Sequence, residues 1–173
     1  YGNGQLSSIS FRGMSAAQTD VLWNGIKLNS PALGQADISL FSFGMLDILQ
    51  VRGIAQNGNV GGELDLVNDV SFDSSLSAKA LFTYGSFNTL RASGNLRFSS
   101  KKLFGATRVS YLSSDNDYTF INTYKAGSPS ERLTNGKVQL LNLMQQFGVK
   151  VNARNSVRFN LWISDARRLV NTR

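Results

Sequence analysis

The chemistry open to this sequence is narrow, because it has eleven carboxylates and eighteen Lys and Arg side chains but neither Cys nor His. It therefore has no thiol nucleophile, no zinc knuckle and no Ser-His-Asp triad. Glycan hydrolysis needs paired carboxylates, and the five acidic residues after position 69 are scattered. The glycine-rich stretch from Gly58 to Gly62 lacks the Lys-Ser/Thr pair of a phosphate loop. We therefore expect no enzyme activity, no metal site and no cofactor.

Charge divides the chain into two unequal regions. Residues 1–69 carry three basic and six acidic groups, a net charge of −3, whereas residues 70–173 carry 15 basic and five acidic groups, a net charge of +10. Such asymmetry indicates regions with different roles. Nucleic-acid binding would need the basic groups on one patch or helix, but here they follow predicted strands. We predict two domains, 1–69 and 70–173, and no nucleic-acid partner.

Five segments of the second region alternate apolar and polar residues, as half-buried antiparallel strands do. The predicted strands cover residues 76–84, 90–98, 103–112, 141–152 and 157–164. Each has one uncharged apolar face, and the cations of these strands lie on the opposite face. These cations are Lys79, Arg91, Arg97, Arg108, Lys150 and Arg158.

Strand and loop lengths favour a membrane wall over a soluble sheet. The predicted strands are about ten residues long, which suits an oblique bilayer crossing. The connections at 85–88, 99–102 and 152–155 are short, whereas the one at 115–136 is long, and long loops at one end are typical of outer-membrane barrels. A soluble antiparallel sandwich also keeps charge off its buried face and is the alternative. The sequence has no apolar run long enough for a membrane helix.

The first region predicts a small mixed α/β unit. Asn24-Gly25 marks a hairpin within residues 21–28, because both positions of such a turn need positive φ. Residues 47–53 and 63–67 are predicted strands, and a short helix is expected near residues 40–45.

Four motifs of this region, in this order, resemble the plug domain of TonB-dependent outer-membrane receptors. They are Ser8-Ile9-Ser10-Phe11-Arg12-Gly13, Asn24-Gly25-Ile26-Lys27-Leu28-Asn29, Asp47-Ile48-Leu49-Gln50-Val51-Arg52-Gly53 and Asn59-Val60-Gly61-Gly62 with Leu66-Val67-Asn68. The residues from Gly4 to Ile9 and the loop from Asn29 to Asp37 look most like the vitamin B12 transporter branch. The resemblance implies the later part of a plug followed by about five strands of a truncated transmembrane β-barrel.

The resemblance also implies a function and its partners. The chain would belong to a receptor in the outer membrane of a Gram-negative bacterium, in contact with membrane lipid. It would take up a scarce nutrient, a cobalamin or a metal–siderophore complex, by active transport coupled to TonB through a segment upstream of Tyr1. The alternative is a soluble β-rich binding or adhesin module.

Site residues follow from the same resemblance. The ligand-binding apical loops correspond to Asn3, Gln5, Asn29, Ser30, Pro31, Leu33 and Gln35. The residues expected to make contacts between plug and barrel wall are Arg12, Arg91, Arg97 and Arg108. The opposite charges of the two regions predict that these contacts are polar and hydrated. Trp23 is expected in the core of its hairpin. The sequence departs from the family at Asn24, where an Asp is usual, and at Glu63, where an apolar residue is usual.

Overall fold

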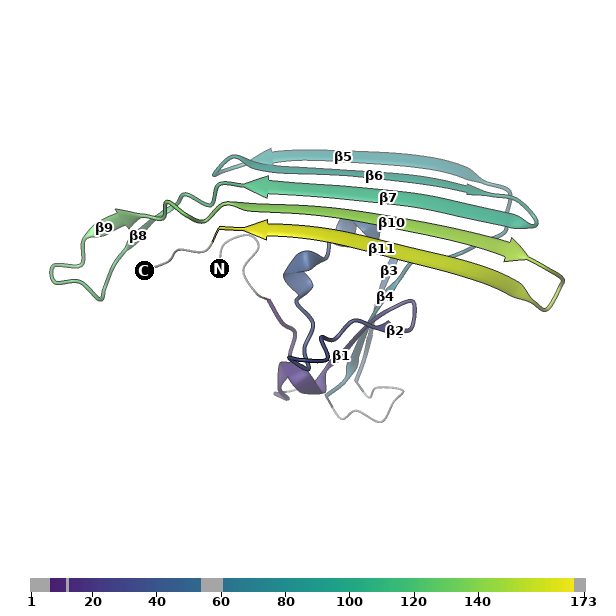
Figure 1. Ribbon diagram of the computed structural model, residues 1–173, viewed down its shortest axis with the longest axis horizontal. Coiled ribbons are helices and arrows are strands. Elements are labelled where there is room, and N and C mark those ends of the chain that lie inside the picture. The colour runs from purple at the N-terminus through teal and green to yellow at the C-terminus, as the bar shows by residue number, and fades with distance from the viewer. Residues whose placement is uncertain (1–6, 12, 54–60, 170–173) are drawn as a thin grey trace.

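The computed structural model describes residues 7–11, 13–53 and 61–169, and it is mainly β. Figure 1 shows a long, gently curved five-stranded sheet with a smaller group of strands and turns against one side of it. We call residues 7–69, where described, the N-terminal unit. No helix in the described ranges has the length and hydropathy needed to cross a membrane.

The five-stranded sheet is an antiparallel meander in the order β11-β10-β7-β6-β5. Its strands are β5 (Leu76–Gly85), β6 (Thr89–Ser99), β7 (Leu103–Ser114), β10 (Val138–Lys150) and β11 (Ser156–Arg168). All five predicted strands are present. β5, β6, β7 and β11 extend one to four residues beyond the predicted bounds, whereas β10 begins three residues earlier and ends two residues earlier than predicted. The sheet is open within the described residues, with β5 and β11 at its edges, so the expected barrel is present only as a five-stranded wall.

The register confirms that the six predicted cations lie on the face opposite to the predicted apolar side chains. Val109 of β7 pairs with Leu143 of β10, which in turn pairs with Ile163 of β11. Arg108 directly precedes Val109 in β7, so its side chain lies on the opposite face. Arg97 pairs with Ala106, two residues before Arg108, and so lies on the same face as Arg108. We call the face with Val109 the exposed face. The face with Arg108, which contacts the N-terminal unit, is the covered face.

The N-terminal unit is built on a four-stranded mixed sheet in the order β2-β1-β4-β3. Its strands are β1 (Asp20–Trp23), β2 (Ile26–Lys27), β3 (Ile48–Arg52) and β4 (Glu63–Val67), with β1 and β4 parallel and the other pairs antiparallel. Asn24 and Gly25 have φ of 49° and 81°, as the predicted hairpin turn requires. The Asn24 side chain accepts from the backbone N–H of Asn68 at 2.8 Å, which ties this turn to the end of β4.

The expectation of a mixed α/β unit is wrong, because the described part of this region has only single 3₁₀ turns. These are η1 (Ala16–Gln18), η2 (Ile38–Leu40) and η3 (Phe43–Met45). The predicted helix near residues 40–45 is thus two separate turns. Asp37 caps η2 by accepting from Ser39 N–H, and the backbone of Phe41 is already extended. The turn therefore contains only the three residues from Ile38 to Leu40. That length cannot close the i→i−4 bonds of an α-helix.

The long connection between β7 and β10 contains a small hairpin that the sequence pattern did not predict. Its strands are β8 (Thr119–Ile121) and β9 (Ser130–Arg132). Lys125 donates to Glu131 at 2.7 Å, and Arg132 is paired with Asp117. Figure 1 shows this hairpin projecting beyond one end of the sheet, while the turns after β6 and β10 lie at the other end.

Candidate functional site

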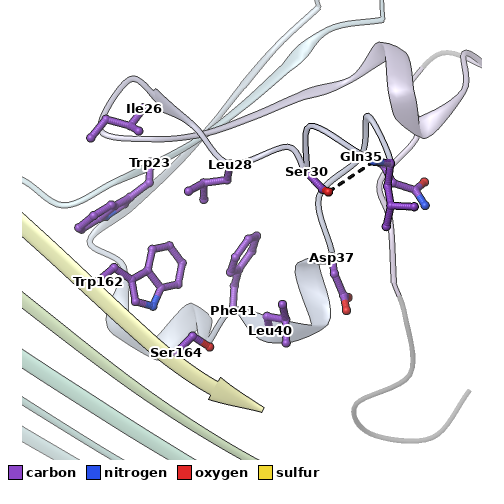
Figure 2. Close-up of a pocket in the computed structure, with 11 residues that line it drawn as sticks. Trp23, Ile26, Leu28, Ser30, Gln35, Asp37, Leu40, Phe41, Trp162 and Ser164 are labelled. Atoms are coloured by element: carbon purple, nitrogen blue, oxygen red, sulfur yellow. Dashed lines mark hydrogen bonds between the residues drawn. The ribbon is translucent and has the colours of Figure 1, made fainter. Parts of the chain in front are cut away.

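A cavity of about 600 Å³ lies between the N-terminal unit and the covered face of β11. Figure 2 shows its aromatic side chains on one side and its polar side chains mainly on the other. The lining is predominantly apolar, as in small-molecule pockets. The residues that line it are Trp23, Ile26, Leu28, Ser30, Leu33, Gln35, Asp37, Leu40, Phe41, Trp162 and Ser164.

Three aromatic rings form one wall of the cavity. The Trp162 ring lies 5.2 Å from that of Trp23 in an edge-to-face arrangement and 5.1 Å from that of Phe41. Trp23 Nε1 donates to Asn68 Oδ1 at 2.8 Å, and Trp162 Nε1 donates to Asn142 Oδ1 at 3.1 Å. Since both indole N–H groups are occupied within the protein, the rings offer the cavity only apolar surface.

The loop after β2 supplies the polar side of the cavity. The amide of Asn29 holds this loop, accepting from Val21 N–H at 2.8 Å and donating to the carbonyls of Thr19 and Gly34 at 2.9 Å. The backbone N–H of Ser30 donates to the Gln35 carbonyl at 3.0 Å. The loop is therefore closed on itself, and the side chains of Ser30, Leu33 and Gln35 are left to line the cavity.

Asp37 ties the same loop to β11. Its carboxylate accepts from Arg168 of β11 at 3.0 Å, from the Ser39 hydroxyl at 2.6 Å and from Ser7 N–H at 3.2 Å. Burial, the largest single effect, raises the pKa of Asp37, but the hydrogen bonds from Ser39, Ser7 and Arg168 together outweigh it and leave the pKa below its usual value. Asp37 is therefore a charged and fully engaged edge of the cavity.

Of the residues predicted to bind ligand, Ser30, Leu33 and Gln35 line the cavity. Asn29 uses its side chain to hold the loop, and Pro31 is exposed on that loop without lining the cavity. Asn3 and Gln5 lie outside the described residues.

Of the residues predicted to join the two regions, Arg108 donates to Asp47 at 2.7 Å and to Gln146 at 2.5 Å. Arg97 donates to Ser71, and its guanidinium lies 5.3 Å from the centre of the Phe104 ring. Arg91 is on the covered face of β6, and Arg12 lies outside the described residues.

The contact between the N-terminal unit and the sheet is only partly polar, which corrects the expectation of a polar, wet interface. Asn95 and Asn142 donate to the carbonyls of Gly44 and Leu40, both at 3.1 Å. Met144 of β10, however, is 1% exposed and packs in the core of the N-terminal unit, with Trp162 beside it. Burial of the apolar surface of Met144 and Trp162 stabilises the interface more than exchangeable polar contacts alone would.

Sequence reasoning missed the part of the cavity contributed by β11 and by η2. Trp162 and Ser164 come from the covered face of β11, and Asp37, Leu40 and Phe41 come from in and around η2. One signal was present: Trp162 is an aromatic residue at a position of β11 whose neighbours on the same face, Asn160 and Ser164, are polar. Trp23 is 4% exposed, so it lies in the core of its hairpin and also borders the cavity.

Comparison with known proteins identifies a similar fold but does not assign the chain to a family. Neither a protein-family model nor a curated protein matches the sequence. A solved structure, "Copper transporter OprC", matches 97% of this chain with a TM-score of 0.74 and 15% sequence identity. The chain spans 26% of the length of that protein. At this identity the match shows a common fold, that of part of a transporter.

These findings correct the assignment made from the sequence motifs. The resemblance to the plug and barrel of TonB-dependent receptors of the vitamin B12 branch is wrong as an assignment, since no family model matches and the structural match is to a copper transporter. The described part of the N-terminal unit also lacks the α-helices expected there. Short motifs of Gly, Asn and Asp mark turns, and many folds use the same turns.

Proposed function

We propose that this chain forms part of an outer-membrane transporter for a scarce small nutrient, with the five-stranded sheet as membrane wall and the N-terminal unit on its inner side. The observation that carries the proposal is the exposed face. Five of its apolar side chains, Leu96, Phe98, Val109, Phe147 and Phe159, are 41–56% exposed. A soluble protein rarely leaves so continuous an apolar surface in water.

Two further features of that face support contact with lipid. On this face, in the middle of the sheet, the hydroxyl of Thr107 donates to the side-chain carbonyl of Gln145 at 2.7 Å, so these two polar side chains are joined to each other. Its charged residues, Asp165 and Arg167, lie at the end of β11 and pair with each other. A charge costs about 2–4 kcal/mol at the middle of a bilayer and little at its surface, so this placement suits a membrane wall.

The inner side of the wall supports a ligand-binding role. The N-terminal unit rests on the covered face through two ion pairs, Asp47–Arg108 and Asp37–Arg168, and the 600 Å³ cavity lies beside the second pair. A ligand bound there would touch both the wall and the unit. Release would then follow from movement of the unit, and the partner that drives this movement, TonB in the interpretation of the sequence, stays a prediction.

Fluorophore labelling of single cysteines tests the wall, because the sequence has no Cys of its own. Ala80 and Lys79 are neighbours on β5, and both side chains are accessible. Ala80 lies on the exposed face and Lys79 on the covered face, so Ala80→Cys and Lys79→Cys compare the two faces. In vesicles of brominated lipid, we expect a bimane on residue 80 to be quenched strongly and one on residue 79 weakly. Equal quenching, or extraction of a stable monomer into buffer without detergent, would favour the soluble binding module.

A further inference from the structure

We infer that the cavity beside Trp162 takes an organic molecule with a flat apolar body and one hydrogen-bonding end, and does not take a free metal ion. This deepens the proposed function and rests on it, since the molecule would be the ligand transported. The inference follows from the size of the cavity and from the donors and acceptors that its walls offer.

Size and lining favour a small organic molecule. A volume of about 600 Å³ lies within the range of roughly 300–1,000 Å³ that is typical of ligand pockets. Trp23, Phe41 and Trp162 present ring surfaces to the cavity, and the indole N–H groups of the two tryptophans already donate within the protein. An aromatic or aliphatic body gains from contact with such rings, whereas a hydrated ion would lose water ligands there without replacement.

The polar side of the cavity is suited to one neutral hydrogen-bonding group. Ser30, Gln35 and Ser164 supply hydroxyl and amide groups, each able to donate and to accept. Asp37 is the one charged residue among the described lining residues, and its carboxylate already accepts from Arg168, Ser39 and Ser7. A strongly cationic ligand would have to displace Arg168 to reach it.

The donor set argues against a soft metal ion such as copper, although the solved neighbour is named as a copper transporter. Copper favours thiolate, thioether and imidazole ligands, and the sequence has no Cys or His. None of the three methionines lines the cavity: Met45 and Met144 are 0% and 1% exposed within the core, and Met14 is half-buried before η1. The described residues also contain no group of three or more acidic side chains that could hold a metal.

The two tryptophans of the chain make this testable, because both line the cavity. We would titrate the full chain in detergent with the neutral probe N-phenylnaphthylamine and follow quenching of tryptophan emission. Ser164→Phe fills the cavity, and Ser156→Phe makes the same change on the same face at the other end of β11. We expect saturable quenching for the native chain and for Ser156→Phe, and about tenfold weaker binding for Ser164→Phe.

A second variant keeps the test informative if Ser164→Phe does not fold. Leu33 is 64% exposed, so Leu33→Ala should fold normally and still weaken probe binding several-fold by removing apolar contact. Equal probe affinity in the native, Ser164→Phe and Leu33→Ala chains would overturn the inference. Calorimetry with Cu²⁺ and Zn²⁺ should give no saturable one-site binding, and such binding abolished by Asp37→Asn would overturn it as well.

Failure of the ligand class and failure of the membrane wall give different results. Loss of saturable probe binding in a protein whose residue 80 still reports lipid would reject only the ligand class. Saturable probe binding in a protein whose residue 80 reports water would uphold the pocket and reject the wall.

Discussion

Arg108 and Asp47 are 61 positions apart in the chain, yet the guanidinium of one donates to the carboxylate of the other across 2.7 Å. The Arg108 side chain is 3% exposed and the Asp47 side chain 33%. Gln146 accepts a second bond from Arg108 at 2.5 Å. This pair joins the covered face of the sheet to the N-terminal unit, so its removal tests how the two are held together.

Asp47→Asn should destabilise the contact between the unit and the sheet, because it leaves a buried guanidinium with weaker acceptors. Breaking a buried pair costs about 3–5 kcal/mol, and the partial exposure of Asp47 lowers the expectation to about 1–3 kcal/mol. Urea unfolding followed by tryptophan emission measures this change. Asp165→Asn, in the exposed pair with Arg167, is the matched control and should shift stability by less than about 0.5 kcal/mol. Equal effects of the two substitutions would show that the Asp47–Arg108 pair is not structural.

The sequence predicted the sign of this contact and named Arg108 as a contact residue, but it did not predict Asp47 as the partner of Arg108. Net charges of −3 and +10 predicted attraction between the regions, whereas the pairing of Asp47 with Arg108 depends on how the two sheets meet. Strand alternation predicted the faces correctly because its period of two is local. Trp162 and Phe41 come together from β11 and from the turn after η2, and no local pattern encodes that approach.

Asp73 predicts a pH dependence in the segment that leads into β5. Its carboxylate accepts from the hydroxyls of Ser99, Ser71 and Ser75 at 2.7, 3.0 and 3.1 Å, and these bonds lower its pKa from 3.8 to about 2. Because the folded-state pKa is depressed, the stabilisation is complete above pH 3.8 and is lost as the pH falls towards about 2. The stability difference between the native chain and Asp73→Asn should therefore shrink across that interval.

Ser99→Ala supplies the matched control for Asp73, since Ser99 makes the largest contribution to the lowered pKa. Its removal should move the carboxyl pKa back towards 3.8, as measured by carbon NMR of the labelled aspartate. An unchanged titration in Ser99→Ala would show that these hydroxyls do not set the pKa of Asp73.

Glu63 and Arg52 form a cross-strand ion pair within the N-terminal unit, and the motif comparison led us to expect an apolar residue in place of Glu63. Glu63 is 1% exposed, and Arg52 faces it from β3. Arg52→Met removes the guanidinium from a buried carboxylate and should cost about 1–3 kcal/mol, because Arg52 itself is partly exposed. The double substitution Arg52→Met/Glu63→Leu should recover most of that loss, since an apolar pair replaces an ion pair at little cost. Additive losses in a double-mutant cycle of thermal unfolding would contradict this.

The long connection between β7 and β10 and the short turns after β6 and β10 should lie on opposite sides of the membrane. Thr123, in the hairpin between β8 and β9, and Lys101, in the turn between β6 and β7, are both exposed and lie at opposite ends of the sheet. Long loops of outer-membrane proteins face the outside of the cell and short turns face the periplasm. Thr123→Cys should therefore react with a membrane-impermeant maleimide on intact cells, whereas Lys101→Cys should react only after the outer membrane is opened.

Reaction of both residues in intact cells would mean that the sheet does not span the membrane, and the reverse pattern would invert its orientation. The same reagent applied to the purified protein in detergent should label both residues equally, so a difference on cells reports topology and not local reactivity.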